Sequence, residues 1–375
     1  MSLKLKNVRL SGFKSIGKET HIPFCEDVTV FIGANGVGKT NFISFFQLLN
    51  QLLAQQLQTY VATKGGANTF LHFGAKITDT IEAKLDFSTE KEVTEYSFYL
   101  KYAADKLFLS YEAIVAGEPE TIFDIFKHIS TFPQYETGLR YYAVNAHENP
   151  DTAAKLSELR AALDGIKYFH LHDTSDTAKI KLSSLVENNA YLMHDCGNLA
   201  AFLLYLQKNK AQYYSRIVKH IQAIMPQFGD FELQQRETDR YCALNWRDKK
   251  GNFFAAHQIS DGSLRFMALA TLLLQPKDTL PSIIIIDEPE LGLHPVALGY
   301  LKSMIYTASE HSQVVLATQS SRLLDEFDAD NIVVVERDAD ESTTFRQLDS
   351  ETLAAWLEEY DLSELYDKNI LGGKP

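Results

Sequence analysis

The chain has 375 residues, of which 45% are hydrophobic, enough to bury one large core with or without an inserted lobe. Its 36 Lys and Arg residues stand against 49 Asp and Glu, a net charge of -13. This balance argues against a chain coated in nucleic-acid-binding surface, although it leaves room for a local basic patch. Cys25, Cys196 and Cys242 lie far apart without the spacing of metal ligands, so we expect reduced structural thiols.

The first ten residues, MSLKLKNVRL, contain no apolar signal segment. The longest apolar stretches, such as FMALATLLL at 266–274 and SIIIID at 282–287, fall short of the roughly 18 residues that a membrane span requires. We therefore expect a cytoplasmic protein with no membrane contact.

The first third of the chain alternates between strand and helix patterns. Strands are predicted at 5–10, 20–24 and 28–32, the last of them apolar throughout. A helix with one strongly apolar face follows at 41–57. Alternating stretches separated by charged turns then predict an antiparallel meander, with strands at 81–87, 96–102 and 107–115.

The remaining two thirds begin with a mostly helical pattern, at about residue 118. Helical periods cover 148–166 and 197–224, and Pro226 ends the second. Two short strands follow, at 231–235 and 241–246. Helices and buried strands then alternate, the sign of a parallel α/β sheet, at 263–274, 282–287, 296–311, 313–318 and 331–336. The tail, 351–375, predicts a short acidic helix followed by a loose end.

The order of these elements predicts one domain that is split by an insertion. The strand at 28–32 and its expected partners past residue 280 belong to the same sheet, so we expect 1–117 and 229–375 to form its two halves. The segment 118–228 is then a mainly helical inserted lobe, and its lack of sustained heptads predicts a compact body and not a coiled-coil arm.

The sequence GANGVGKT, from Gly33 to Thr40, follows an apolar strand and opens a helix, the setting that a phosphate-binding loop requires. Glycines let the backbone wrap round phosphates, and the helix N-terminus adds partial positive charge. We expect Lys39 to reach the β- and γ-phosphates and Thr40 to ligate Mg²⁺. The alternative is a plain glycine turn. The residues expected to bind the nucleotide here are Gly33, Ala34, Asn35, Gly36, Val37, Gly38, Lys39, Thr40 and Asn41.

A second motif, SIIIIDEPELGLHP, joins a strand buried on both faces to two carboxylates. Ligands of open α/β sheets lie beyond the carboxyl ends of the strands, so both should face the nucleotide. We expect Asp287 to hold Mg²⁺, through water or Thr40, and Glu288 to act as general base on the attacking water. A solvated turn is the alternative.

Two further stretches carry polar residues at the ends of elements. In ISDGSLRF, Ser260 is a natural N-cap, Asp261 follows it, and Gly262 allows close backbone approach, so the helix start predicts a second anion site. The alternative is an ordinary capped helix. In QVVLATQSS, Gln319 follows a strand and is expected to contact the γ-phosphate or the lytic water, as a catalytic switch residue.

Three other candidates are weaker. His170, His172 and Asp173 resemble metal ligands, but no third and fourth ligand can be placed, so we expect a loop that packs on the neighbouring lobe. His72 lies between the helix predicted at 41–57 and the meander, where a γ-phosphate-sensing loop is expected. Lys14 either approaches the nucleotide base or is a surface lysine, and the sequence favours the latter.

Taken together, these motifs resemble the ABC-type ATPases of the RecF/SMC group, and most of all the stand-alone predicted bacterial ATPases that share HDTS, NLAAFLLYL, SDGSLRF and endings of the LGGKP type. The resemblance implies an α/β fold, the ABC-type P-loop head, in which N-terminal antiparallel strands and a parallel core form a mixed sheet. It also implies ATP and Mg²⁺ as cofactors and a homodimer in which Ser260 and Gly262 cap, in trans, the ATP held by the partner's P-loop. Leu291, Gly292 and Leu293 would form the D-loop at that interface.

The chain departs from the pattern of the group in two places, the signature and the switch. Asp261 and Ser263 replace a glycine and a glutamine of transporter signatures, and Gln319 stands where many relatives carry histidine. Glutamine cannot become cationic, so we expect slow hydrolysis, that of a timer or sensor.

The resemblance further implies that ATP-driven dimerisation gates a partner, either a nuclease-like or Toprim-type effector or DNA, in anti-phage defence or DNA maintenance. The first rival is a RecF-like repair ATPase that clamps DNA directly, and steep salt dependence of binding would favour it. The others are a transporter subunit and a scaffold that binds ATP without hydrolysing it.

Overall fold

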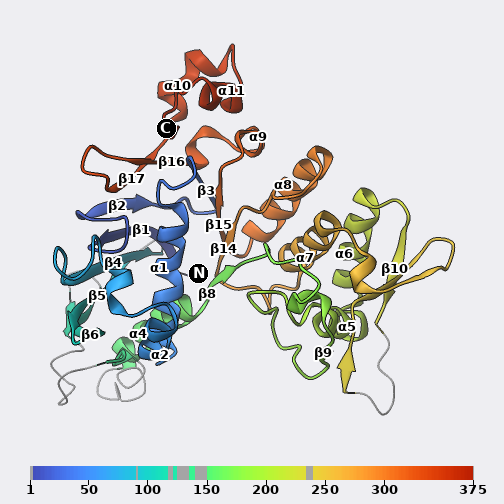
Figure 1. The fold of residues 1–375 in the computed structure, drawn as a ribbon, viewed down its shortest axis with the longest axis horizontal. Coiled ribbons are helices and arrows are strands. Elements are labelled where there is room, and N and C mark those ends of the chain that lie inside the picture. Colours follow the sequence, from blue (N-terminus) through green and yellow to red (C-terminus); the bar gives the residue numbers. More distant parts are fainter. Residues whose placement is uncertain are drawn as a thin grey trace. The chain divides into compact units, whose positions relative to one another are not determined.

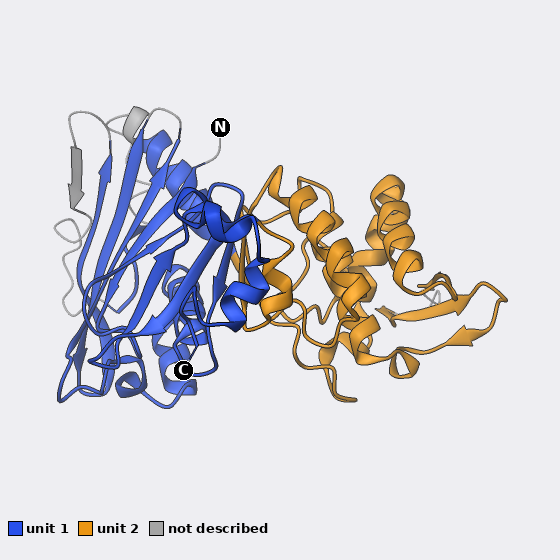
Figure 2. Ribbon diagram, turned by 90° about the horizontal axis from the view of Figure 1, so that it is seen from above, with its two compact units in different colours: residues 1–166, 328–375 blue, residues 167–327 orange. Residues whose placement is uncertain are grey.

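The computed structural model describes residues 3–89, 92–116, 121–124, 135–139, 150–233 and 240–374. They divide into unit 1, residues 1–166 and 328–375, and unit 2, residues 167–327, which are coloured separately in Figure 2. The borders predicted at residues 117 and 228 fall inside unit 1 and unit 2 respectively, and the three-part division stays a prediction. Of the predicted lobe, 118–120, 125–134 and 140–149 lie outside the described residues.

The larger sheet of unit 1 is antiparallel, in the order β2-β1-β4-β5-β6-β7 (Figure 1). Its strands are β1 (Lys4–Ser11), β2 (Thr20–Pro23), β4 (Thr80–Ser88), β5 (Val93–Ala103), β6 (Lys106–Ala116) and β7 (Thr121–Asp124). Buried and partly exposed side chains alternate along β4, because successive side chains point to opposite faces of a sheet. The predicted meander is confirmed.

A second group of strands in unit 1 carries the glycine loop. In β3 (Val28–Ile32) every residue is buried, and the strand pairs in parallel with β16 (Ile332–Arg337). Strand β17 (Thr343–Gln347), which the sequence pattern did not predict, pairs antiparallel with β16. Its residues TTFRQ are mostly polar and partly exposed, which hides the periodicity of an edge strand.

The helices of unit 1 begin directly after the glycine loop. They are α1 (Lys39–Leu53), α2 (Leu57–Thr63), the 3₁₀ turn η1 (Ala67–Phe70), α4 (Pro150–Asp164), η5 (Ala329–Asn331), α10 (Ser350–Leu357) and α11 (Leu362–Asp367). The single helix predicted at 41–57 is wrong at its end, because Gln55 adopts φ 60°, a left-handed conformation that ends α1. The predicted loose end is also wrong: Leu371 is buried and the backbone of Gly373 is hydrogen-bonded on both sides.

Unit 2 contains the other parallel strands. Strand β14 (Ile283–Asp287) pairs in parallel with β15 (Gln313–Thr318) and also neighbours β8 (Ile166–Phe169). The helices on either side of β14 in sequence, α7 (Asp261–Leu274) and α8 (Pro295–Ser309), pack on each other, and α9 (Ser321–Leu324) follows β15. These elements were all predicted except β8 and α9.

The rest of unit 2 is a layer of helices and short strands. They are η3 (Lys179–Lys181), β9 (Ser184–Leu185), α5 (Leu199–Asn209), α6 (Ala211–Ile224), β10 (Phe228–Glu232), β11 (Tyr241–Cys242), β12 (Asn245–Asp248), β13 (Phe253–Phe254) and η4 (Ala256–Gln258). The single helix predicted at 197–224 is two, because Lys210 leaves the helical region, with φ -138° and ψ 49°. None of the helices within the described ranges combines the length and the hydrophobicity of a membrane span.

Candidate nucleotide-binding site

The glycine loop of unit 1 is tightly enclosed by its own neighbours. Gly36 and Gly38 have φ 83° and 118°, values that side chains rarely allow. A Cβ atom on Gly38 would lie 2.1 Å from Thr343 Oγ1 and 2.6 Å from Ser15 Oγ, so no larger residue fits there. The motif therefore needs glycine for two reasons, backbone conformation and close contact.

Lys39 is buried and lies where the loop closes. Its Nζ donates to the carbonyl oxygens of Gly33, at 2.5 Å, and Ala34, at 3.0 Å. The α1 N-cap is Gly38, so no side chain caps the N–H groups of the first turn. Uncapped N–H groups at a helix start, beside a lysine, fit the phosphates of a nucleotide. The side chain of Thr40 is exposed and its hydroxyl is therefore accessible to a Mg²⁺ ion.

Other residues of unit 1, not identified from sequence, hold the loop from outside. Arg337 donates from Nε and Nη2 to the Gly36 carbonyl, at 3.1 and 2.8 Å. Thr343 Oγ1 donates to the Val37 carbonyl at 2.7 Å. These residues follow Gly33 by about 300 positions in the chain, so no local spacing could have indicated them.

Asn41, expected to bind nucleotide, donates from its side chain to Ser15 Oγ at 3.0 Å. It therefore ties α1 to the turn that contains Lys14.

Lys14 and His72, two other candidates of unit 1, are neighbours in the structure. The surface position expected for Lys14 is wrong: the side chain is half-buried, Nζ donates to Ser44 Oγ at 2.7 Å, and burial lowers its pKa. His72 is also buried and donates from Nδ1 to the Lys14 carbonyl, at 2.7 Å. The sensing role of His72 stays a prediction.

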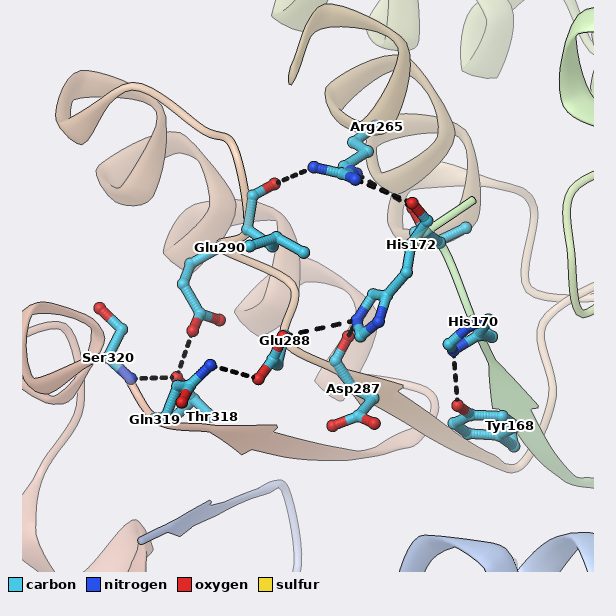
Figure 3. A network of polar contacts seen from close by, with 12 residues as sticks. Tyr168, His170, His172, Arg265, Asp287, Glu288, Glu290, Thr318, Gln319 and Ser320 are labelled. Atoms are coloured by element: carbon cyan, nitrogen blue, oxygen red, sulfur yellow. Dashed lines mark hydrogen bonds and ion pairs between the residues drawn. The ribbon is translucent and has the colours of Figure 1, made fainter. Parts of the chain in front are cut away.

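The two carboxylates that end β14 have different surroundings in unit 2. Asp287 is 4% exposed. Glu288 has φ 45°, in the left-handed region where a non-glycine residue is strained, and such strain clusters at functional sites. Its Oε1 accepts a hydrogen bond from Gln319 Nε2 at 2.7 Å, so the candidate base and the candidate switch residue are in contact (Figure 3).

A third carboxylate, Glu290, lies beside them. Its Oε1 accepts from Thr318 Oγ1 at 2.5 Å, and Thr318 Oγ1 accepts from the Ser320 N–H at 2.9 Å. Its Oε2 is buried with no hydrogen-bond partner among the described residues. Burial, and secondarily the charges of Glu288 and Asp287, raises the pKa of Glu290 to about 7. No argument from sequence pointed to this residue.

His172 is the second functional candidate in unit 2 that sequence reasoning missed, because from sequence its loop was expected only to pack on a neighbouring lobe. Its Nε2 donates to the Asp287 carbonyl at 3.1 Å and lies 3.8 Å from Glu288 Oε2 (Figure 3). The ring therefore supports the candidate base from the side opposite Gln319. The signal available in the sequence was the polar HDTS stretch itself.

Arg265, on α7, fastens the His172 loop to the turn after β14. Its guanidinium donates to the carbonyls of Leu171, at 3.1 Å, and His172, at 2.8 Å. It also donates to the Leu291 carbonyl at 3.1 Å. One side chain thus joins the start of α7, the His172 loop and the candidate D-loop (Figure 3).

The start of α7 is capped as predicted, and its residues are accessible. Ser260 Oγ accepts from the Ser263 N–H, and Ser260 and Asp261 are exposed. A Cβ on Gly262 would lie 2.2 Å from the Gly292 carbonyl, so glycine is required here for contact with the D-loop. Asp261 lies 3.6 Å from Lys181 Nζ.

The predicted site residues therefore fall into two groups. The glycine loop, Lys39 and Thr40 belong to unit 1, whereas the carboxylates, the switch, the signature-like turn and the D-loop belong to unit 2. Within each unit the structure brings its own group together.

Comparison with known proteins identifies the family of the chain. Residues 28–325 match the family described as "AAA domain, putative AbiEii toxin, Type IV TA system". No curated protein matches the chain in sequence.

Solved structures show the fold. An SMC head bound to the C-winged helix domain of ScpA has a TM-score of 0.61 and 16% identity, with 94% of this chain and 99% of that chain covered. An SMC head with an extended coiled coil, bound to the C-terminal domain of ScpA and derived from Pyrococcus furiosus, has a TM-score of 0.52 at 16% identity, covering 95% and 99%. The predicted fold class is therefore confirmed. The chain belongs to this AAA-domain family of P-loop ATPases and has the fold of an SMC head.

Proposed function

We propose that the protein binds ATP with Mg²⁺, hydrolyses it slowly, and forms a homodimer around two ATP molecules. The observation that carries the proposal is the contact of Glu288 with Gln319 on one side and His172 on the other. A carboxylate held in this way at the end of a buried strand is placed to accept a proton from water. Glu288 is only partly buried, so water can reach it.

In this proposal each unit supplies one part of the reaction. The uncapped first turn of α1 and Lys39 bind the phosphates, and Thr40 and Asp287 hold the cation. When bound, Mg²⁺ would neutralise charge on the β- and γ-phosphate oxygens. Glu288 accepts the proton of the attacking water while the Gln319 amide orients it, and the hydrolysis is slow because Gln319 contributes no positive charge.

Exposed side chains at the candidate signature, in the candidate D-loop and on α8 support the proposed dimer. Ser260 and Asp261 are exposed at the start of α7, where N–H groups favour an anion. Leu291 of the D-loop and Val296 and Tyr300 of α8 are exposed apolar side chains, 38%, 62% and 37% accessible. An ATP-bound partner would cover these surfaces and bring its own phosphates to Ser260.

The partner that the dimer gates is, in this proposal, a protein effector. Two solved SMC heads of this fold are bound to a domain of ScpA, so heads of this type can present a surface to a second protein. The family description names a toxin of a type IV toxin–antitoxin system, which supports an effector-linked role in defence. The acidic chain, with net charge -13, favours a protein effector over direct DNA clamping.

The test is the oligomeric state of three variants with and without Mg·ATP, measured by light scattering during gel filtration. Glu288→Gln is expected to accumulate an ATP-bound dimer, and the double variant Glu288→Gln/Ser260→Arg to bind ATP as a monomer. Glu288→Gln/Ser157→Arg, altered at an exposed serine of α4, is the matched control and should dimerise.

An ATP-bound monomer for Glu288→Gln would refute the dimer. A dimer that survives Ser260→Arg would refute the role of Ser260 in trans. Unchanged ATP hydrolysis in Glu288→Gln would refute the assignment of the base.

A further inference from the structure

The glycine loop is also held by the last described residues of the chain. The Ala34 N–H donates to the Gly373 carbonyl at 2.8 Å. The carbonyl of the same peptide unit, that of Gly33, accepts from Lys39 Nζ. The Gly33–Ala34 peptide is therefore bound at both ends, by the catalytic lysine on one side and by Gly373 on the other.

The segment Leu371–Gly373 is fixed by three different elements of unit 1. Arg346 of β17 donates to the Leu371 carbonyl at 2.5 Å, and the Gly373 N–H donates to Glu336 of β16 at 2.7 Å. The Tyr366 hydroxyl on α11 donates to the Gly373 carbonyl at 3.1 Å. Burial raises the pKa of Tyr366 to about 12, so the phenol keeps its proton and remains a donor. Figure 1 shows this end of the chain between α10–α11 and β16.

The two glycines of this segment are required by shape. Gly372 and Gly373 have φ 79° and 81°. A Cβ on Gly373 would lie 2.9 Å from Val334 Cγ1, 3.1 Å from Tyr366 Cε2 and 3.7 Å from Gly33 Cα. Any side chain at Gly373 would therefore push the segment away from the glycine loop.

We propose that Leu371–Gly373 is a clamp that positions the glycine loop, so that it sets the affinity of the site for nucleotide phosphates. Lys39 must leave the Gly33 carbonyl to reach a phosphate, whereas the bond from the Ala34 N–H to the Gly373 carbonyl can remain. The clamp keeps the Gly33–Ala34 peptide in position while the Lys39 side chain moves. The clamp residues act through the glycine loop and do not contact the nucleotide. This role rests on the proposed binding of ATP.

The test compares Gly373→Ala with Gly251→Ala. Gly251 also has a left-handed φ, of 86°, but a Cβ there meets no atom within 4 Å, so this control carries the same backbone cost without the collision. Two quantities are measured: hydrogen–deuterium exchange of the peptide that contains Ala34, without nucleotide, and the dissociation constant of a fluorescent ATP analogue.

In Gly373→Ala the Ala34 amide is expected to exchange hydrogen for deuterium at least tenfold faster than in Gly251→Ala. The dissociation constant of the ATP analogue is expected to be at least tenfold higher than for Gly251→Ala. At saturating ATP the hydrolysis rate should match that of the control, because Glu288 is unchanged. Glu336→Gln, which keeps an acceptor for the Gly373 N–H, should bind like wild type, whereas Glu336→Ala should resemble Gly373→Ala.

Unchanged exchange in Gly373→Ala would overturn the clamp. Faster exchange with unchanged affinity, or a loss confined to thermal stability, would overturn its functional role. A wild-type protein that binds no ATP at all would refute the proposed function, while the exchange experiment would still decide whether Gly373 holds the loop.

Discussion

Replacing Glu290 by glutamine should change how the stability of the protein depends on pH. Glu290 has a pKa of about 7 in the folded protein, against an ordinary value of 4.5, because it is buried and lies near two other carboxylates. The unfolded chain releases its proton at lower pH, so between pH 4.5 and 7 the folded state binds more protons. Stability therefore falls as the pH rises through this window.

The size of the effect follows from the pKa difference. A pKa difference of about 2.5 corresponds to at most about 3.5 kcal/mol of unfolding free energy, since a pKa difference of one is worth about 1.4 kcal/mol. Glutamine cannot titrate but keeps an acceptor for the Thr318 hydroxyl. Relative to Glu290→Gln, the wild type should thus lose up to about 3.5 kcal/mol between pH 4.5 and 7, and the difference should then stay constant.

The assay is urea unfolding of both proteins from pH 4.5 to 8 in buffer free of divalent metal ions. Taking the difference between the two proteins cancels the titration of groups that do not interact with Glu290, such as the buried Glu112, whose pKa is also raised by burial. Glu310→Gln, at an exposed position after α8, is the control and should show no pH-dependent difference from wild type. A stability difference between wild type and Glu290→Gln that is the same at every pH would refute the reasoning.

Two further substitutions test the packing of the core of unit 1 and the role of His172. Phe42 is 1% exposed and packs its ring against other phenylalanines of unit 1. Phe42→Ala should therefore lower the free energy of unfolding, measured in urea, by about 3–5 kcal/mol. Phe253 is half-exposed, so the control Phe253→Ala should lower it far less. His172→Ala should lower ATP hydrolysis at saturating ATP about tenfold with little change in KM, because the ring contacts Glu288 and lies in the other unit from the glycine loop. The exposed His311→Ala is its control, and a change in KM alone would contradict this role.

Much of the fold was predictable because most of its elements have strong local patterns. The antiparallel strands show alternation, and β14 is an unbroken apolar run that ends in two carboxylates. Two of the errors occur where a single residue changes the backbone direction without glycine or proline. Gln55 ends α1 in a left-handed conformation, and Lys210 divides α5 from α6, and neither residue type announces such a break.

The sequence by itself determined the two candidate motifs, because each is encoded in a few consecutive residues. Lys39 and Thr40 belong to the glycine loop, and Asp287 and Glu288 to the acidic end of a strand. The tertiary structure alone decided what holds those parts. His172 reaches Glu288 from 116 positions away, and Gly373 reaches Ala34 from the far end of the chain. Such contacts leave no period or spacing in a sequence, because they depend on where packed strands and loops end in space. For this reason the sequence predicted a loose tail at the end of the chain. In the structure Leu371–Gly373 lies against the glycine loop.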